Sequence, residues 1–393
     1  MERRAARPSP ALGDSHNFGR RVEARGDRIR KPRTLLWEWL LLGRDSPLRK
    51  LLAEKARSSG PGEDTFGFLP SLQFWLDRGE VARLELAPLR AGSAVARREL
   101  AVVVGRSLAL WSWLGASDLH WENLALGVDT GGRIVFGPLD VELLLGDLAR
   151  PTETKLLPDA DPEYAEICRH AAGVRRVLPH LGKPVGAGEL LAMAGAYLAT
   201  LAFLEHQAPE IARLLARIPG IDDTPIRVLL RGTGEYLHTE GLWPPLLDAE
   251  REQLDRGDVP YFFRLLGRPG IHYYVEPSLT RLGRLPLRGD VPRLDPILRP
   301  DRGLRSPSRR RLREEGLFTL LGAFDDASLT GVHQTSELAV RFGARDLVVT
   351  FPDGAELRSR RNLRAFVGSV YLPCHCGEVS SVLVPRATRC DAG

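Results

Sequence analysis

The sequence predicts an α+β protein with two lobes and a C-terminal α+β extension. Residues 21–31 alternate in the manner of two short strands joined by a turn at Arg25-Gly26-Asp27. Residues 190–205 form an Ala-rich apolar run that is typical of a buried helix. Beyond Pro269 proline and arginine become frequent, and Asp353-Gly354 between two apolar stretches indicates a hairpin. Strands are therefore expected first, helices in the middle, and a mixed unit at the end.

The first lobe is assigned to residues 13–90. Residues 1–12 are polar, contain Arg and Pro, and are predicted to be a disordered tail. The first hairpin is followed by an apolar helix over residues 35–42. Mixed strand and hairpin structure is then expected over residues 66–89, with a turn at Asp77-Arg78-Gly79. These elements predict a small strand-and-helix lobe.

The second lobe, residues 91–265, is predicted to be mainly helical. Ser93 is a suitable N-cap for a helix that runs to Leu114 and is apolar on most faces. A short strand follows at residues 134–136. The remaining residues, 266–393, are expected to complete the fold and have no assigned role.

The composition is that of a soluble globular protein. The chain has 393 residues, 43% hydrophobic and 27% charged, and contains no apolar run near the roughly 20 residues of a membrane span. No apolar segment follows the charged N-terminus, so we expect no secretory signal and a cytoplasmic location. A net charge of +5 spread over this length argues against a nucleic-acid-binding protein, which would carry a clustered basic face.

The cysteines give little indication of a metal site. Cys374, His375, Cys376 and Cys390 could supply four zinc ligands. However, adjacent ligands lack the two-residue spacer that directs two sulfurs at one ion, so reduced surface thiols are favoured over zinc.

Two acidic motifs are the most informative part of the chain. Asp118-Leu119-His120-Trp121-Glu122-Asn123 is followed, seventeen residues after Asn123, by Asp140-Val141-Glu142. In kinases a catalytic Asp is followed by an Asn and then by a metal-binding Asp after the next strand. The attacking hydroxyl needs a carboxylate to accept its proton, and the phosphates of ATP need Mg²⁺ held by oxygen ligands. The His two residues after the Asp is more similar to phosphoinositide lipid kinases than to ordinary protein kinases.

Lys31 is the candidate cation for the ATP phosphates. Kinases carry such a Lys on a strand of the N-terminal lobe, and Lys31 closes the predicted hairpin. It is also one of only five lysines among 55 basic residues. The alternative is a surface lysine at a strand end.

Six ordered blocks make the chain resemble the dehydratase domain of LanM-type class II lanthipeptide synthetases. These blocks are Gly13-Asp14-Ser15-His16-Asn17-Phe18-Gly19-Arg20-Arg21-Val22, Lys31-Pro32-Arg33, residues 117–124, Asp140-Val141-Glu142, residues 227–236 and Gly257-Asp258-Val259-Pro260-Tyr261-Phe262. The resemblance implies a two-lobe, lipid-kinase-like core. It also implies a peptide Ser/Thr dehydratase that phosphorylates the hydroxyl with ATP and Mg²⁺ and then eliminates the phosphate.

The resemblance implies a role for each site residue. Asp118 would be the general base and His120 a second catalytic residue, while Lys31 would bind the nucleotide. The metal ligands would be Asn123, Asp140 and Glu142. The elimination step would use Arg227 and Thr233, with Arg231 as a helper, because donors stabilise the charge of the departing phosphate. The non-catalytic alternatives are caps or turns for Asp118, Asn123 and Asp140, and a core histidine for His120. For Arg227 and Arg231, the alternative is a chance match, because arginine is abundant throughout the chain.

The sequence also departs from the family pattern. The cyclase motifs of these synthetases are missing, so no ring formation is expected from this chain. Leader recognition is in doubt, and the expected partners are a precursor peptide and a separate cyclase or leader-binding protein. Two alternatives stay open, namely a kinase without elimination and a truncated, non-catalytic protein that binds a precursor peptide.

Overall fold

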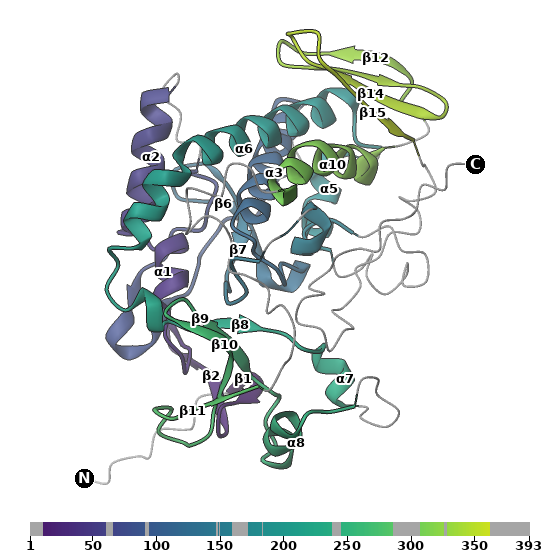
Figure 1. The fold of residues 1–393 in the computed structure, drawn as a ribbon. Helices are drawn as coiled ribbons and strands as arrows, with labels where there is room; N and C mark the ends of the chain where they lie inside the picture. Colours follow the sequence, from purple (N-terminus) through teal and green to yellow (C-terminus); the bar gives the residue numbers. More distant parts are fainter. Residues whose placement is uncertain are drawn as a thin grey trace.

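A computed structural model of the chain describes residues 11–59, 66–90, 94–146, 148, 150–158, 172–182, 184–237, 245–285, 307–325 and 328–361. The fold mixes helices and antiparallel sheets, as expected of an α+β protein (Figure 1). Residues 1–10, Ser93 and the cysteine cluster at 374–390 lie outside the described residues.

The first sheet has the strand order β1-β2-β3-β5-β4, and all neighbours in it are antiparallel. Its strands are β1 (Ala11–His16), β2 (Arg20–Arg25), β3 (Arg28–Arg30), β4 (Phe74–Trp75) and β5 (Glu80–Ala82). Gly26 opens the two-residue turn between β2 and β3 with φ 62°, a conformation that glycine adopts readily. The predicted hairpin is confirmed, and β1 begins two residues before the expected start of order.

Two helices separate β3 from β4. They are α1 (Leu36–Leu42) and α2 (Pro47–Ser59), and the short 3₁₀ turn η1 (Leu76–Arg78) then joins β4 to β5. Ala24, Ile29 and Val81 turn one face of the sheet toward the core, whereas Arg25, Arg28 and Arg30 occupy the other face. The strand-and-helix character predicted for this part is confirmed.

The centre of the protein is a helical body. Helix α3 (Ala94–Trp113) packs against α6 (Ala187–Leu215), and a Cβ atom on Gly105 would collide with the backbone of Met193. Glycine at this position therefore allows the two helices to approach closely. The core is completed by large buried aromatic side chains, namely Trp111, Trp113 and Tyr197. Other short elements are η2 (Trp121–Asn123), η3 (Pro151–Thr154), η5 (Gly173–Arg176), α5 (Leu178–Leu181) and η6 (Ile221–Asp223).

A two-stranded hairpin of β6 (Leu124–Val128) and β7 (Ile134–Pro138) carries the two acidic motifs at its ends. It confirms the predicted strand at 134–136. Because Leu124 pairs with Pro138, the residues just before β6 and just after β7 are neighbours. The backbone N–H of Leu139 donates to the carbonyl of Asn123 over 2.8 Å, which extends this pairing.

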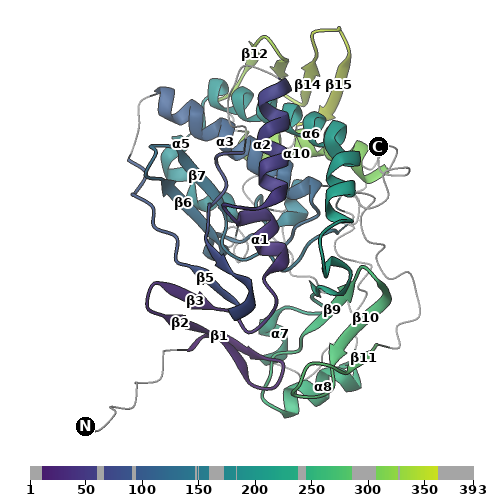
Figure 2. The ribbon, with the colours of Figure 1, turned by 90° about the vertical axis from the view of Figure 1, so that its left-hand side faces the viewer.

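A second sheet has the order β11-β10-β9-β8, formed by β8 (Ile226–Val228), β9 (Phe262–Leu265), β10 (Arg268–Tyr274) and β11 (Leu282–Arg284). Helices α7 (Thr233–Leu237) and α8 (Asp248–Asp255) lie between β8 and β9 in sequence. The boundary expected at residue 266 is wrong, because Arg268 pairs with Leu265 and the sheet continues across it. Figure 2 shows this sheet beside the first sheet at the lower end of the molecule.

The C-terminal part adds α10 (Pro307–Phe324) and an antiparallel sheet of β12 (Gly331–Gln334), β13 (Ala339–Phe342), β14 (Asp346–Thr350) and β15 (Glu356–Arg360). The predicted hairpin at Asp353-Gly354 is confirmed, with Gly354 at φ 83°. Tyr197 Oη donates to the carbonyl of Leu312 over 2.7 Å. Apolar residues of α10 and β13 belong to the main core, so these residues complete the fold.

Candidate active site

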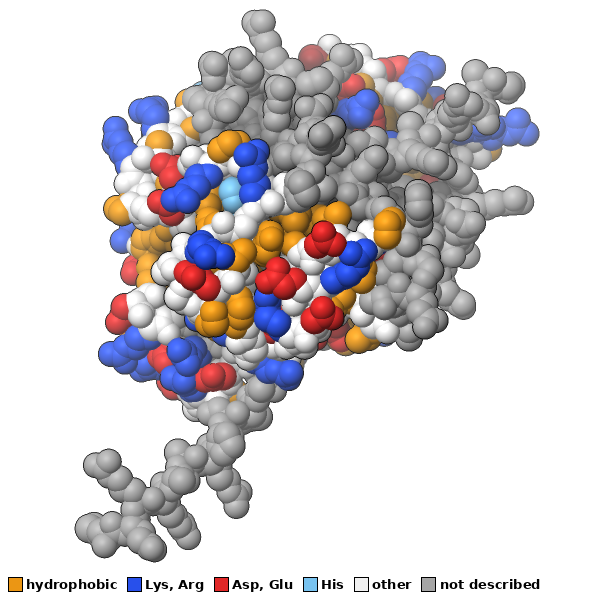
Figure 3. Space-filling model, turned by 60° about the horizontal axis from the view of Figure 1, so that its bottom comes forward, with side chains coloured by type: hydrophobic (Ala, Val, Ile, Leu, Met, Phe, Trp, Pro, Cys, Tyr) orange, Lys and Arg blue, Asp and Glu red, His pale blue; other side chains and the backbone are white. Residues whose placement is uncertain are grey.

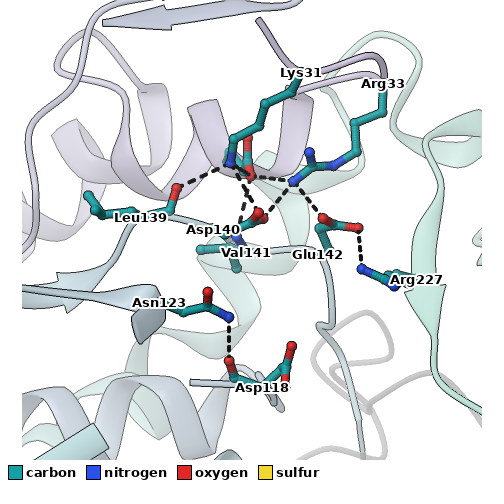
Figure 4. Close-up of polar contacts among 10 residues, drawn as sticks. Lys31, Arg33, Asp118, Asn123, Leu139, Asp140, Val141, Glu142 and Arg227 are labelled. Carbon is teal, nitrogen blue, oxygen red and sulfur yellow. Dashed lines mark hydrogen bonds and ion pairs between the residues drawn. The ribbon is translucent and has the colours of Figure 1, made fainter. Parts of the chain in front are cut away.

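Lys31 joins the first sheet to α1 and to the loop after β7. Its Nζ lies 2.7 Å from Glu38 Oε1 and 3.3 Å from Asp140 Oδ2, and the Lys31 and Glu38 side chains are 7% and 4% exposed. The backbone N–H of Lys31 donates to the carbonyl of Gly79, so β5 fixes the point from which the side chain extends. Figure 4 shows Lys31 directed at the Asp140 loop, above Asn123 and Asp118.

Arg33 stands at the centre of the acidic groups. Its Nη2 lies 2.7 Å from Glu38 Oε1, 2.6 Å from Asp140 Oδ1 and 2.9 Å from Glu142 Oε1. Burial would raise the pKa of Asp140, but the charges of Arg33 and Lys31 outweigh it and hold that pKa well below its usual range. Burial raises the pKa of Glu38 to about 7, against the opposing charges of Arg33 and Lys31.

The contacts of Lys31 and Arg33 form one ion-pair cluster with Glu38, Asp140 and Glu142. The predicted metal ligands lie in or beside this cluster. Asn123 donates from Nδ2 to the Asp118 carbonyl over 2.9 Å, while Asp140 and Glu142 face Arg33. Amide and carboxylate oxygens are donors of the type that Mg²⁺ prefers, so the chemistry of the set fits magnesium. Within the described part of the chain, however, His, Cys, Asp and Glu side chains form no group of three arranged to hold a metal ion. A metal at Asp140 and Glu142 would therefore have to displace Arg33.

Asp118 occupies a loop that is held from two sides. The backbone N–H of Ser117 donates to the Leu143 carbonyl, and the N–H of Leu119 donates to the Thr154 carbonyl over 3.0 Å. Asp118 itself has φ 64°, which is uncommon for a residue other than glycine. Its carboxylate pairs with Lys155. Burial would raise the pKa of Asp118, but Lys155, with smaller contributions from His120 and Arg227, holds it below its usual value.

His120 lies at the edge of this loop. Its side chain is 26% exposed, and Nδ1 is 3.9 Å from Glu122 Oε2. Burial lowers the pKa of His120 despite the opposing effect of Asp118. The imidazole is therefore neutral at physiological pH.

The three predicted elimination residues separate in the fold. Arg227 joins the cluster, with Nη1 3.4 Å from Glu142 Oε2, and its guanidinium lies over the Tyr261 ring at 5.3 Å. Arg231 is 2% exposed and pairs instead with buried Glu250 at 3.0 Å. Thr233 begins α7 as an exposed residue. The structure thus brings together Lys31, Asp118, Asn123, Asp140, Glu142 and Arg227, but holds Arg231 in a different cluster.

Asp258 explains why the Gly-Asp block lies against the turn between β1 and β2. Asn17, Phe18 and Gly19 all have positive φ, so the N–H groups of the β1–β2 turn converge. The Asp258 carboxylate accepts from the N–H groups of Phe18 (2.7 Å) and Gly19 (2.9 Å) and from Ser15 Oγ (2.7 Å). The segment between α8 and β9 therefore anchors the β1–β2 turn of the first sheet.

Several site residues were missed from the sequence. Glu38 had one signal, as the only acid in the apolar helix Leu36–Leu42. Arg33 belongs to the Lys31-Pro32-Arg33 block but had no assigned role, and Lys155 is one of the five lysines of the chain. His16 Nδ1 lies 2.8 Å from the Val259 carbonyl, and its ring is 5.7 Å from that of Tyr261. Burial and Arg227 lower the pKa of His16, so its imidazole is neutral near pH 7.

A groove of about 1290 Å³ opens beside the cluster, between the first and second sheets. Lys31, Arg33 and Tyr261 line it together with further arginines, namely Arg20, Arg21, Arg25, Arg30 and Arg78. Figure 3 views the molecule from this lower end, where basic and acidic side chains lie interspersed. The volume exceeds that of a typical small-molecule pocket, so a nucleotide or a peptide segment would fit.

Comparisons with known proteins identify no family. The chain matches no protein-family model, and no curated protein matches it.

Helix α6 is, among the described residues, long and apolar enough to cross a membrane by length and composition. Half of its most apolar window is buried inside the protein, where it packs on α3 and α10. A buried core helix has the same composition, so this feature is weak evidence for a span.

Proposed function

We propose that the protein is an ATP-dependent peptide Ser/Thr dehydratase, which phosphorylates a hydroxyl and then eliminates the phosphate. The observation that carries this proposal is the double contact of Lys31 with Glu38 and Asp140. A strand Lys, a helix Glu and a metal-binding Asp after the catalytic loop are the recurring parts of a kinase site. Here they come from the residue after β3, from α1 and from the loop after β7, in that chain order.

In the first step the substrate hydroxyl attacks the γ-phosphate of ATP. Asp118 accepts the hydroxyl proton, and Lys31 binds the nucleotide phosphates. Asn123, Asp140 and Glu142 would hold Mg²⁺, which neutralises developing phosphate charge when bound. Asp118 is kept ionised by Lys155, so it is ready to accept a proton.

In the second step a base removes the α-proton, the electron pair forms the Cα=Cβ bond, and the Cβ–O bond breaks as phosphate leaves. Arg227 is the donor that stabilises the departing phosphate. His16 is the base, because its imidazole is neutral near pH 7 and both it and Arg227 lie against Tyr261. The product is dehydroalanine or dehydrobutyrine, without ring formation.

Two observations favour other functions. Exposed Thr233 and buried Arg231 lie outside the Arg227 cluster, which favours a kinase of a peptide or small molecule that stops at the phosphate. Arg33 fills the space between the metal-binding carboxylates, which favours a non-catalytic protein that binds a precursor peptide. Against the latter, the reacting groups Lys31, Asp118, Asn123 and Asp140 are intact.

Mass spectrometry of Ser/Thr-containing peptides incubated with protein, ATP and Mg²⁺ separates these functions. The dehydratase gives loss of water, the kinase gives a stable phosphate adduct, and the binding protein gives unchanged peptide. Arg227→Met should convert loss of water into phosphate adduct, with Arg217→Met as a control outside the cluster. A separate cyclase or leader-binding partner and a cytoplasmic location belong to the same proposal.

A further inference from the structure

We propose that Lys155 is a positioning residue of phosphoryl transfer, which holds the Asp118 carboxylate in the orientation that accepts the hydroxyl proton. This inference rests on the proposed function. Lys155 Nζ donates to Asp118 Oδ1 across 37 residues of sequence. The two side chains are 13% and 27% exposed, so the pair is largely withdrawn from solvent while part of the carboxylate stays open.

Asp118 and Lys155 both have an uncommon backbone conformation. Asp118 has φ 64° and Lys155 has φ 70°, and neither is a glycine. Left-handed conformations are costly for such residues and persist where the surroundings enforce them, often at functional sites. Asp118 and Lys155 both have this costly conformation and are joined by an ion pair. We therefore take their contact to be a specific feature of the fold and not a chance pairing of surface charges.

Hydrogen bonds fix the two segments to each other. The N–H of Leu119 donates to the Thr154 carbonyl over 3.0 Å, and Ser117 Oγ donates to the Glu153 carbonyl over 3.0 Å. These bonds flank Asp118 on one segment and end next to Lys155 on the other. The Lys155 carbonyl in turn accepts from the N–H of Gly173 over 2.9 Å, which holds Lys155 from its far side.

The remaining groups around Asp118 cannot take over this task. The charged or titratable groups that act on it besides Lys155 are His120 and Arg227. Burial lowers the pKa of His120, so it is neutral and carries no charge toward the carboxylate near pH 7. Arg227 is paired with Glu142. Asn123 holds the Asp118 backbone carbonyl, which leaves the side chain to Lys155.

The test is ATP turnover with water as the acceptor, using Mg·ATP alone as the probe. Lys155→Gln keeps length and an N–H donor but removes the charge. It should lower kcat by about tenfold to a hundredfold, less than the roughly 10²- to 10⁴-fold that a positioned general base contributes, because the base itself is retained. KM for ATP should change less than about twofold, because the nucleotide contacts are those of Lys31. Lys155→Arg should recover much of the loss.

Two controls make the outcome specific. Lys55→Gln removes a partly exposed lysine paired with Glu210 and should leave kcat unchanged. In an Asp118→Asn background, Lys155→Gln should cause little further loss, because a positioning residue acts through its partner. If Lys155→Gln does not fold, kcat is measured instead for Lys155→Arg, after a thermal melt has shown that this variant is folded.

Wild-type kcat in Lys155→Gln, or an equal loss in the Asp118→Asn background, would overturn the inference and leave the proposed function intact. A folded Lys155→Arg protein with no recovery of kcat would also overturn it. Absence of both ATP turnover and peptide phosphorylation in the wild-type protein would instead contradict the proposed function itself.

Discussion

A single nitrogen of Arg33 lies 2.6 Å from Asp140, and the same atom is within 2.9 Å of Glu142 and Glu38. One guanidinium therefore neutralises Asp140 and Glu142, the carboxylates that a kinase-type site would use to bind magnesium. Carboxylates at this spacing need a cation when they are withdrawn from water, because their like charges repel strongly. Arg33 and a metal ion are thus alternative partners of Asp140 and Glu142.

Arg33→Met is expected to destabilise the metal-free protein by roughly 3–5 kcal/mol, the usual effect of breaking a buried ion pair. Mg²⁺ or Mn²⁺ should restore part of that loss, because the ion can replace the guanidinium between Asp140 and Glu142. Urea unfolding with and without metal measures both effects. Arg30→Met is the matched control, because Arg30 ends β3, close to Arg33 in sequence, and is 43% exposed. An identical metal response in both variants would contradict the competition.

Substitutions of Arg231 and Thr233 should differ in their effect on the free energy of unfolding. Arg231→Met leaves buried Glu250 without its ion-pair partner and should cost roughly 3–5 kcal/mol of unfolding free energy. Thr233→Ala changes an exposed residue and should stay within about 0.5 kcal/mol. Chemical denaturation measures both. Should Thr233→Ala nevertheless block elimination while the fold stays intact, Thr233 reaches the cluster in the working enzyme.

Asp258 should make the free energy of unfolding depend on pH in the acidic range. Burial would raise the pKa of Asp258, but hydrogen bonds from Ser15 and the N–H groups of Gly19 and Phe18 lower it below its usual value. A carboxyl with a lowered folded pKa stabilises the fold above its unfolded pKa of about 3.9, and this contribution is lost as pH falls through the folded pKa. Asp258→Asn should therefore cost about 1–3 kcal/mol at pH 7 and less below about pH 4. A pH-independent difference between the two proteins would refute this account.

Local structure could be predicted from the sequence where one residue decides it. Gly26 fixes the β2–β3 turn, and Asp353-Gly354 fixes the last hairpin, because glycine allows positive φ there. The boundary at 266 could not be found in this way. Proline and arginine become frequent within the β9–β10 hairpin, where outward positions of a paired strand tolerate polar residues, so composition changed inside one sheet.

The site was predictable only in part, since its contacts are long-range. The spacing of Asp118, Asn123 and Asp140 reflects one hairpin, which sequence order can reveal. Lys155 meets Asp118 across 37 residues, and Arg33 meets Asp140 across 107. No local pattern indicates such pairs. The resemblance of residues 227–236 to the elimination motif predicts Arg231 as a helper, but its side chain pairs with Glu250 on α8.

Isothermal calorimetry of ATP binding tests the central claim most directly, because it requires no knowledge of the peptide. Wild-type protein should bind ATP in the presence of Mg²⁺ or Mn²⁺ and far more weakly with EDTA. Asp140→Asn should abolish the metal dependence, and Lys31→Met should weaken binding through loss of a phosphate contact. Lys50→Met, outside the cluster, should bind as wild type does. Folded wild-type protein that binds no nucleotide with either metal would contradict the kinase-type site, and with it the proposed dehydratase.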